Sequence, residues 1–448
     1  MQKVTTTGNA TLIAYDDCPV LVTDPWFGDE QPAYFGSWVL SHYIPANLRQ
    51  DMMACEYVWF SHGHPDHLNP AGIERFRGRK ILLPDHVNGR IFNDLKADYD
   101  VTILPDRKWV DLSENIRVQC ITTRLQDAIL LVDVAGRLFI DLNDAGTRDC
   151  AHYIRNIARG YEHSHVLALS GYGDADMINF FDEQGKFVLP RAARKPSVGQ
   201  QLNLLSKATG AKTVVPFSSF HQYQRADSMW AQKYTTPMSA FTEGLDSSMQ
   251  YIPPFSSIDC RDGAVETYAP KEFAVTARPP EEFGDNWSDQ LTKEDQQDID
   301  AYFARKAAVQ DYFGFVNFRV GGKDYASRMR GPKDRGITFS VPRNSLVTAI
   351  RYRIFDDLLI GNFMKTTLHG VSSLNDGYFN YNVAKYGDNG GAETHEELRR
   401  YLAEYRRRAG LDYIVSAFED KSKDFITRFA AQDSGLYKLI KRFYVMVR

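Results

Sequence analysis

The chain has 448 residues, more than one average domain, so two domains are expected. The hydrophobic share of 43%, the charged share of 25% and the formal net charge of −4 are typical of a soluble globular protein, and they give no electrostatic argument for nucleic acid or an anionic membrane as partner. The N-terminus has no apolar signal segment, and no stretch is long enough to span a membrane. Five scattered cysteines without a Cys-x-x-Cys pair are interpreted as reduced thiols of a cytoplasmic protein.

Residues 10–23 form a β-hairpin pattern, with two apolar runs on either side of a polar turn. Because Pro19 cannot donate to a strand ladder, the second strand is expected to begin after it. The Asp24-Pro25 pair that follows is, taken alone, a turn initiator. Residues 31–50 are rich in aromatic residues and have no clean period, which predicts a long loop.

Residues 57–68 carry the strongest chemical signal in the chain. The apolar run Tyr57–Phe60 predicts a buried strand, and the sequence Ser-His-Gly-His-Pro-Asp-His follows it directly. Ligand-type side chains packed this densely would repel one another or lie unsatisfied unless a cation gathered them. Neutral imidazole suits zinc, iron, copper or nickel, and the carboxylate adds a harder oxygen ligand. A polar loop that is rich in histidine by chance is the alternative.

Alternating strand and helix signals over residues 69–123 favour a layered α/β core. Two apolar strands follow, at residues 127–134 and 136–144, joined by a tight glycine turn. Asp127 precedes the first and Asp144 ends the second, although Asp127 could cap a turn and Asp144 could belong to an Asx-turn. A further strand at residues 211–217 ends in a polar loop.

The His-x-His-x-Asp-His pattern resembles the signature of the metallo-β-lactamase fold, whose members hold one or two metals at the edge of an αββα sandwich. The resemblance implies an α/β fold of four layers with a C-terminal α+β extension. It also implies that His62 and His64 serve one metal while Asp66 and His67 serve the second.

The remaining ligands of this family come from later loops. Asp144 matches the carboxylate that bridges both metals, and His221 stands where the fold supplies its last histidine. Most hydrolytic members carry a histidine where this chain has Asp127, and no histidine occurs between residues 86 and 152. Asp24 matches an aspartate that lies beneath the metal loop and contacts its ligands. The expected metal ligands are therefore His62, His64, Asp66, His67, Asp127, Asp144 and His221, with Asp66 and Asp144 also assigned catalytic roles.

Within this fold, the chain resembles the metallo-β-lactamase part of the CMP-N-acetylneuraminate hydroxylase family. The similar segments cover residues 10–300 and continue weakly to residue 361; they include residues 62–67, 127–144, 215–220, 227–234 and 279–287. Two departures stand out. A Rieske iron–sulfur cluster needs two cysteine and two histidine ligands, and the chain has a single Cys-x-His, at residues 150–152, so no Rieske domain is expected. His221 replaces an aromatic residue of that family.

The composition shifts near Pro279-Pro280, which predicts a boundary. We expect a catalytic metallo-β-lactamase-fold domain at residues 1–278 and a C-terminal α+β and helical accessory domain at residues 279–448.

The expected ligand set has four imidazoles, three carboxylates and no thiolate, so iron is favoured, with zinc or manganese as alternatives. Family members that act as oxygenases carry a carboxylate at the position of Asp127. The leading hypothesis is a non-haem di-iron oxygenase that hydroxylates or oxidises a small molecule, either free or linked to a carrier or nucleotide. It would use O2 and an external electron donor, such as a separate electron-transfer protein.

The alternative is a binuclear hydrolase of a lactone, ester or phosphodiester. A third hypothesis, a metal-binding scaffold without activity, is disfavoured because every expected ligand position holds a competent residue. Candidate substrate contacts are polar residues on the loops, for each of which ordinary loop polarity is an equal alternative, namely Tyr172, Asp174, Ser218, Ser219 and Arg225.

Overall fold

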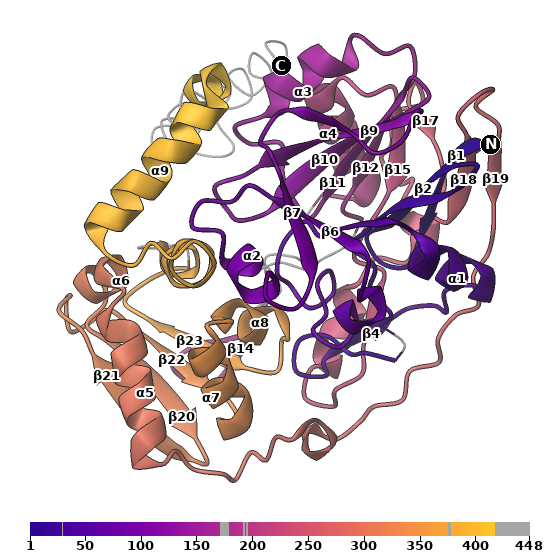
Figure 1. Cartoon of the computed structure of the whole chain (residues 1–448). Helices are drawn as coiled ribbons and strands as arrows, with labels where there is room; N and C mark the ends of the chain where they lie inside the picture. The colour runs from indigo at the N-terminus through magenta and orange to yellow at the C-terminus, as the bar shows by residue number, and fades with distance from the viewer. Residues whose placement is uncertain (29, 171–178, 191–192, 194–195, 375–377, 417–448) are drawn as a thin grey trace, which may run out of the picture.

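The computed structural model describes residues 1–28, 30–170, 179–190, 193, 196–374 and 378–416 (Figure 1). Two large sheets dominate the first part of the chain. The first sheet has eight strands in the order β19-β18-β1-β2-β3-β5-β6-β7. Their bounds are Val265–Thr267, Ser256–Asp259, Gln2–Thr7, Thr11–Asp16, Cys18–Thr23, Tyr57–Trp59, Lys80–Pro84 and Asp100–Leu104.

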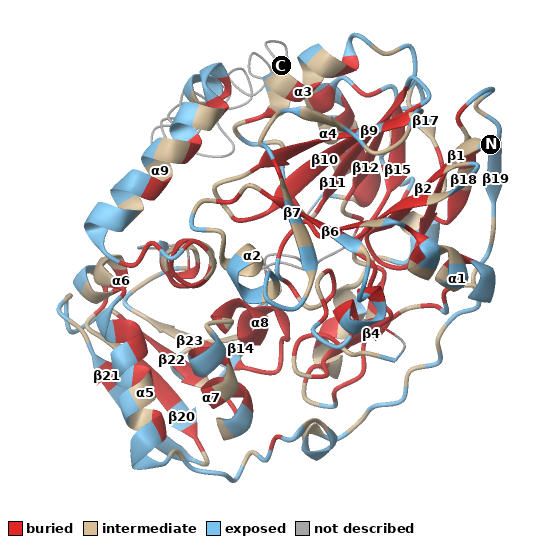
Figure 2. Cartoon of the chain, in the orientation of Figure 1, coloured by how far each residue is buried: buried red, intermediate tan, exposed pale blue. Residues whose placement is uncertain are grey.

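The second sheet has seven strands in the order β17-β15-β12-β11-β10-β9-β8. Their bounds are Gln250–Tyr251, Thr213–Pro216, Ser164–Ala168, Arg137–Asn143, Ala128–Val134, Ile116–Thr122 and Trp109–Asp111. Side chains alternate between the two faces of each strand, so β10 sends Leu130 toward the first sheet and Leu131 toward the helices behind it. The facing sides of both sheets are buried, as the red strands of Figure 2 show.

Helices cover both outer faces of this pair of sheets. Ile154 of α3 (Ala151–Ala158) and Leu202 of α4 (Val198–Thr209) pack on the second sheet. On the first sheet lie α1 (Ala46–Ala54), the 3-10 helix η1 (Ile73–Phe76) and α2 (Arg90–Leu95). The predicted αββα sandwich is confirmed.

The C-terminal α+β extension is also confirmed. Its six-stranded sheet has the order β14-β13-β23-β22-β20-β21, with bounds Phe187–Val188, Asn179–Phe181, Lys365–His369, Gly336–Ser340, Phe315–Val320 and Lys323–Arg328. Four helices accompany this sheet, namely α5 (Lys293–Ala304), α6 (Ala307–Tyr312), α7 (Arg343–Tyr352) and α8 (Phe355–Ile360). Because β13 and β14 precede residue 279 and yet join this sheet, the domain boundary at residue 279 stays a prediction.

Two further helices connect the C-terminal part to the sandwich. The π-helix η8 (Tyr381–Asn389) and α9 (His395–Ala409) follow the six-stranded sheet. In α9, Tyr401 accepts a hydrogen bond from Gln126 Nε2 at 2.7 Å, and Tyr405 lies 3.1 Å from His86 Nδ1. Each of these bonds joins segments more than 270 residues apart along the chain.

Several local predictions were wrong. The stretch at residues 31–50 holds β4 (Trp38–Leu40) and the start of α1 rather than only a loop. The hairpin is present, but its second strand begins at Cys18, before the proline. His221 opens a short strand, β16 (His221–Tyr223), that pairs with β4. The remaining short elements are η4 (Met229–Tyr234), η5 (Met238–Ala240) and η6 (Pro280–Phe283).

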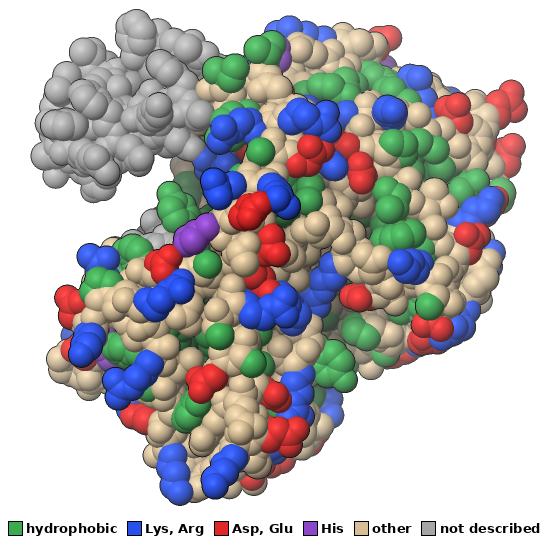
Figure 3. Space-filling view, turned by 60° about the vertical axis from the view of Figure 1, so that its left-hand side comes forward, with side chains coloured by type: hydrophobic (Ala, Val, Ile, Leu, Met, Phe, Trp, Pro, Cys, Tyr) green, Lys and Arg blue, Asp and Glu red, His purple; other side chains and the backbone are tan. Residues whose placement is uncertain are grey.

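The surface and the cysteines bear on the expected partners. On the face shown in Figure 3, basic and acidic side chains are interspersed and do not gather into one basic patch. All five cysteines are described and unpaired, and only Cys18 is exposed. Among the described residues, no helix combines the length and apolar character needed to cross a membrane.

Candidate metal centre

The histidine-rich turn begins where β5 ends, at the edge of the first sheet. The neighbouring strand β3 runs parallel to β5, so Asp24, which follows β3, emerges at the same edge. Its backbone amide donates to Trp59 O at 2.9 Å. The Asp24 carboxylate accepts hydrogen bonds from Ser61 N at 2.8 Å and from Ser61 Oγ at 2.7 Å. Asp24 therefore fixes the first residue of the turn.

Each histidine of the turn is held through one ring nitrogen by a buried polar partner. The other nitrogen is thereby left to face the interior of the site, which is how proteins orient metal-binding imidazoles. The inward nitrogens of His62 (Nε2) and His64 (Nδ1) lie 2.8 Å apart, close enough to face one cation. The outer partners are Ser61 Oγ for His62 Nδ1 at 2.8 Å, Asp356 Oδ2 for His64 Nε2 at 2.9 Å and Asp24 Oδ2 for His67 Nδ1 at 2.9 Å.

Three side chains bring their ligand atoms together in the described structure. His62, His67 and Asp144 each offer one ligand atom within 4.8 Å of the other two. His67 Nε2 lies 3.4 Å from Asp144 Oδ2 and 3.6 Å from Asp66 Oδ2. Ligands at about 2.0–2.2 Å from one cation lie about 3–3.5 Å from each other, so the spacing suits a shared metal ion.

Unpartnered buried atoms support the same conclusion. His67 Nε2, Asp144 Oδ1 and both ring nitrogens of His221 are buried without a hydrogen-bond partner among the described residues. Leaving such groups unsatisfied is costly, and native structures rarely do so. A cation would satisfy them, and the predicted use of metal is supported by this geometry.

The charge of the site also calls for cations. Burial raises the pKa of Asp66, and it raises the pKa of Asp357 to about 7. Burial alone would lower the pKa of His67, but the carboxylates of Asp66, Asp24 and Asp144 outweigh it, so the pKa of this imidazole is raised. Without a metal, the buried site therefore holds protons that offset its carboxylates, and a bound cation would take over this role.

Asp66 is held rigidly. Its Oδ2 accepts a hydrogen bond from Asn9 Nδ2 at 2.9 Å, and its Oδ1 accepts one from Tyr34 OH at 2.5 Å. Asn9 also accepts from the backbone amides of Ser218 at 3.1 Å and Phe220 at 2.8 Å. One asparagine thus connects the histidine turn to the loop that leads to His221. A carboxylate fixed at both oxygens suits a ligand better than a mobile proton acceptor.

Asp127 lies beside a residue of the C-terminal part of the chain. Its Oδ1 is 3.6 Å from Lys385 Nζ, and Lys385 Nζ is 3.3 Å from Asp356 Oδ2. Burial would lower the pKa of Lys385, but the two carboxylates outweigh burial, so its pKa is raised and the amine is cationic. Asp127 is outside the three-residue group of His62, His67 and Asp144, as are the expected ligands His64, Asp66 and His221.

His221 is held by an aromatic stack. Its ring lies parallel to that of Trp38, with a centroid separation of 3.4 Å and an interplanar angle of 3°. Burial lowers its pKa to about 3, so the imidazole is neutral, which is the form that binds metals. The carboxylate of Asp144 is close enough to oppose this shift.

Strained backbone clusters around the site. Four non-glycine residues next to or within the expected ligand loops have left-handed backbone angles, with φ of 39° at Asp24, 39° at Asn143, 69° at Ser218 and 60° at Ser219. Such conformations persist only where surrounding contacts enforce them, and they gather at functional sites.

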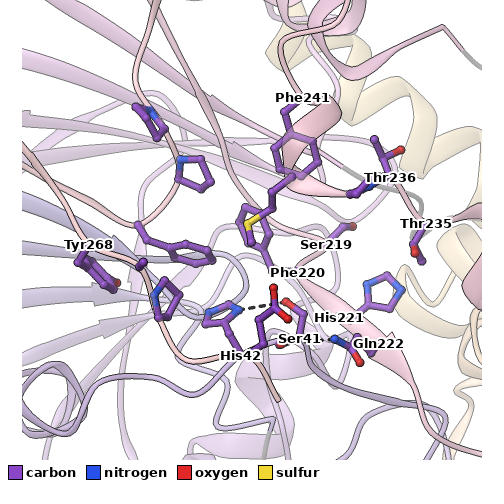
Figure 4. Close-up of a pocket in the computed structure, with 18 of the residues that line it drawn as sticks. Ser41, His42, Ser219, Phe220, His221, Gln222, Thr235, Thr236, Phe241 and Tyr268 are labelled. Atoms are coloured by element: carbon purple, nitrogen blue, oxygen red, sulfur yellow. Dashed lines mark hydrogen bonds between the residues drawn. The ribbon is translucent and has the colours of Figure 1, made fainter. Parts of the chain in front are cut away.

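A cavity borders the strand that carries His221. It has a volume of about 650 Å³, and its lining includes Ser219, Phe220, His42 and Tyr268. In Figure 4 the imidazole of His221 points away from the ring of Phe220, as alternation along a strand requires. His221 and Gln222 of this strand also line the cavity, so the cavity reaches the strand that carries this expected ligand.

The residues expected to contact the substrate lie in different surroundings. Ser219 lines the cavity, and Ser218 lies in the loop next to Asn9. Arg225 is fully buried in ion pairs with Asp227 at 2.8 Å and Asp285 at 2.7 Å. Tyr172 and Asp174 lie outside the described residues.

Sequence reasoning missed several residues that contact the expected ligands. Asn9 and Tyr34 hold Asp66, while Asp356 and Lys385 approach from the C-terminal part. The only signal for them was the segment 356–361, which belongs to the resemblance described above but carries no metal-ligand pattern.

Comparisons with known proteins give partial matches. No family model matches the chain. A cytidine monophosphate-N-acetylneuraminic acid hydroxylase of Asterias rubens is 26% identical over 135 residues, which is 28% of this chain and 20% of the relative. The chain thus spans about a fifth of the length of that relative.

Two solved structures illustrate the structural similarity. CmlA, a di-iron β-hydroxylase from Streptomyces venezuelae, matches with a TM-score of 0.34 and 15% identity over 49% of this chain and 45% of its own. The metallo-β-lactamase fold protein YhfI of Bacillus subtilis matches with a TM-score of 0.33 and 11% identity over 59% of this chain and 98% of its own.

Proposed function

We propose that this chain, which has the metallo-β-lactamase fold, is a metal-dependent oxygenase that holds two iron ions and oxidises a small molecule. The observation that carries the proposal is the group formed by His62, His67 and Asp144. Its ligand atoms are imidazole nitrogens and a carboxylate oxygen, donors that suit iron, and the group holds no thiolate to favour zinc. The name of the hydroxylase relative supports the same reaction class.

The ligands would be shared between two positions. Asp144 would lie between them, with His62, His64 and Asp127 at one position and Asp66, His67 and His221 at the other. Bound iron would supply the redox chemistry by which O2 is activated, with electrons from an external donor. The chain's own contribution is to orient the imidazoles through Ser61, Asp24 and Asp356, and to bury the site from water.

Metal exchange and two assays test this proposal. Protein freed of metal is loaded with Fe2+ without oxygen, supplied with a chemical reductant, and exposed to O2 in an oxygen electrode. We expect reductant-dependent O2 consumption that the His67→Ala variant loses and the His152→Ala variant, which removes an exposed histidine outside the site, retains.

The competing function is hydrolysis, and the same preparation distinguishes it. The protein is loaded with Zn2+ and given p-nitrophenyl acetate and bis(p-nitrophenyl) phosphate. Cleavage that depends on His67, together with O2 consumption no greater than that of free Fe2+, would overturn the oxygenase proposal in favour of a binuclear hydrolase.

A further inference from the structure

The C-terminal part of the chain reaches the metal centre through α8. Asp356 is the second residue of this helix, and its Oδ2 accepts a hydrogen bond from His64 Nε2 at 2.9 Å. The side chains of His64 and Asp356 are 9% and 6% exposed, so water competes weakly for this bond. The hydrogen bond places the proton on Nε2 and leaves the Nδ1 lone pair facing His62 Nε2, 2.8 Å away.

A second element, the π-helix η8, supplies the counter-charge. Lys385 places its ammonium group 3.3 Å from Asp356 and 3.6 Å from Asp127. Its side chain is 13% exposed, so the charge acts in a mostly dry environment. π-helical segments are rare and are frequently found at functional sites. Lys385 thus links Asp356, the partner of His64, to the expected ligand Asp127.

We propose that Asp356 and Lys385 are positioning residues of the metal centre, so that the C-terminal α+β extension (here the C-terminal module) helps to orient its ligands. Asp356 sets the tautomer and orientation of His64. Lys385 holds Asp356 and Asp127 in place and limits the repulsion between their carboxylates. The inference rests on the proposed metal-binding function, but its statement about the His64 tautomer does not require a metal.

Packing explains why these two residues are aimed at the site. Within α8, Phe355, Leu358 and Leu359 are buried in the core of the C-terminal module, which fixes the orientation of the helix. The η8 segment is anchored separately, because Asp388 accepts hydrogen bonds from Tyr302 at 2.7 Å and from Lys306 at 2.8 Å. Both positioning residues therefore rest on rigid elements, as a preorganised site requires.

Metal affinity of the full-length protein is the first test. Wild type, Asp356→Leu, Asp356→Asn and Lys385→Met are titrated with Co2+ against a chelator and followed by visible absorption. Loss of a residue that orients a metal ligand typically weakens metal binding 10- to 100-fold, and we expect this for Asp356→Leu and Lys385→Met. Asp356→Asn, which keeps an acceptor oxygen for His64, should lose less.

Asp295→Asn is the matched control. Asp295 is a buried acid of the same module that pairs with Arg343 at 2.7 Å and has no contact with the site. Its substitution should leave Co2+ affinity unchanged. Equal Co2+ affinity in the wild type and in the Asp356 and Lys385 variants would overturn the inference, whereas failure of the wild type to bind metal would overturn the proposed function instead.

The histidine tautomer is the second test and needs no metal. Metal-free protein labelled with 15N-histidine is examined by NMR, with the His64 signals assigned from their loss in His64→Gln. We expect the Nε2–H form in the wild type and a mixture of tautomers in Asp356→Leu. Two results would contradict the inference. One is a wild-type His64 that carries its proton on Nδ1. The other is a His64 tautomer that is the same in the wild type and in Asp356→Leu, whatever the stability of that variant.

Discussion

His67 Nδ1 and Asp24 Oδ2 lie 2.9 Å apart, and neither side chain is exposed to solvent. The same carboxylate holds both the amide and the hydroxyl of Ser61. A single aspartate therefore sets the direction of one expected metal ligand and the start of the turn that carries the others. We derive the first prediction from this arrangement.

Replacing Asp24 should weaken metal binding without removing a ligand. We expect Asp24→Asn to lower metal affinity about 10- to 100-fold, because His67 loses its charged partner. Chelator competition with Co2+ measures the change. Asp133→Asn is the control. It removes a carboxylate of β10 that pairs with Arg117 of β9, and it should bind metal as the wild type does. Unchanged affinity in Asp24→Asn would show that Asp24 only stabilises a turn.

Trp38 should matter for stability because it carries the His221 ring. Its side chain is buried, stacks on His221 and contacts Tyr34 edge-on at a centroid distance of 4.6 Å. We expect Trp38→Ala to lower the free energy of unfolding by about 3–5 kcal/mol and Trp38→Phe to lower it less. Urea denaturation measures both. If Trp38→Ala costs under about 1 kcal/mol, the stack is not a structural support.

Arg225 should be structural rather than part of a substrate pocket. It is fully buried, and its removal would leave the buried carboxylate of Asp285 without its charged partner. We expect Arg225→Met to lower the free energy of unfolding by about 3–5 kcal/mol while the metal content of the folded protein is unchanged. If Arg225→Met keeps the wild-type stability and loses only turnover, Arg225 contacts the substrate instead.

The sequence was most informative where signals are local. The hairpin, the strand before the histidine turn and the strands that end at Asp144 follow from apolar patterns of a few residues. The position of Asp24 beneath the turn also followed from the resemblance, and the structure places it there. These features depend on short-range spacing, which one sequence displays directly.

The remaining parts depend on contacts that no local pattern encodes. Asp356 and Lys385 reach the site from elements that begin more than 200 residues after the histidine turn. Trp38 forms a strand only because it pairs with the strand that His221 opens. Its own segment has no strand pattern, so the sequence predicted a loop. Arg225 has the polarity of a pocket residue, and only its ion pairs show that it is buried.

His165 provides a pH-dependent prediction away from the metal centre. It is buried in β12 and stacks on Phe139 at 4.8 Å, and burial lowers its pKa to about 4, below the ordinary 6.5. The unfolded chain therefore binds a proton at this residue more tightly than the folded chain. The stability it contributes is fully present above pH 6.5 and is lost as pH falls toward 4.

Substitution of His165 should flatten this dependence. Between pH 7 and pH 4 we expect His165→Leu to lose up to about 3 kcal/mol less stability than the wild type. Urea denaturation across this range measures the difference. His163→Gln, which changes a half-exposed histidine next to the same strand, should follow the wild-type curve. Parallel curves for His165→Leu and wild type would show that His165 binds a proton equally well in the folded and unfolded chains.

Elemental analysis of purified protein tests the central claim most directly. Protein produced with added iron and without added zinc should contain about two metal ions per chain, mainly iron, and His67→Ala should lose metal while His152→Ala keeps it. Wild-type protein that retains no metal under these conditions, or His67→Ala protein with the full wild-type content, would contradict a metal centre at the histidine turn.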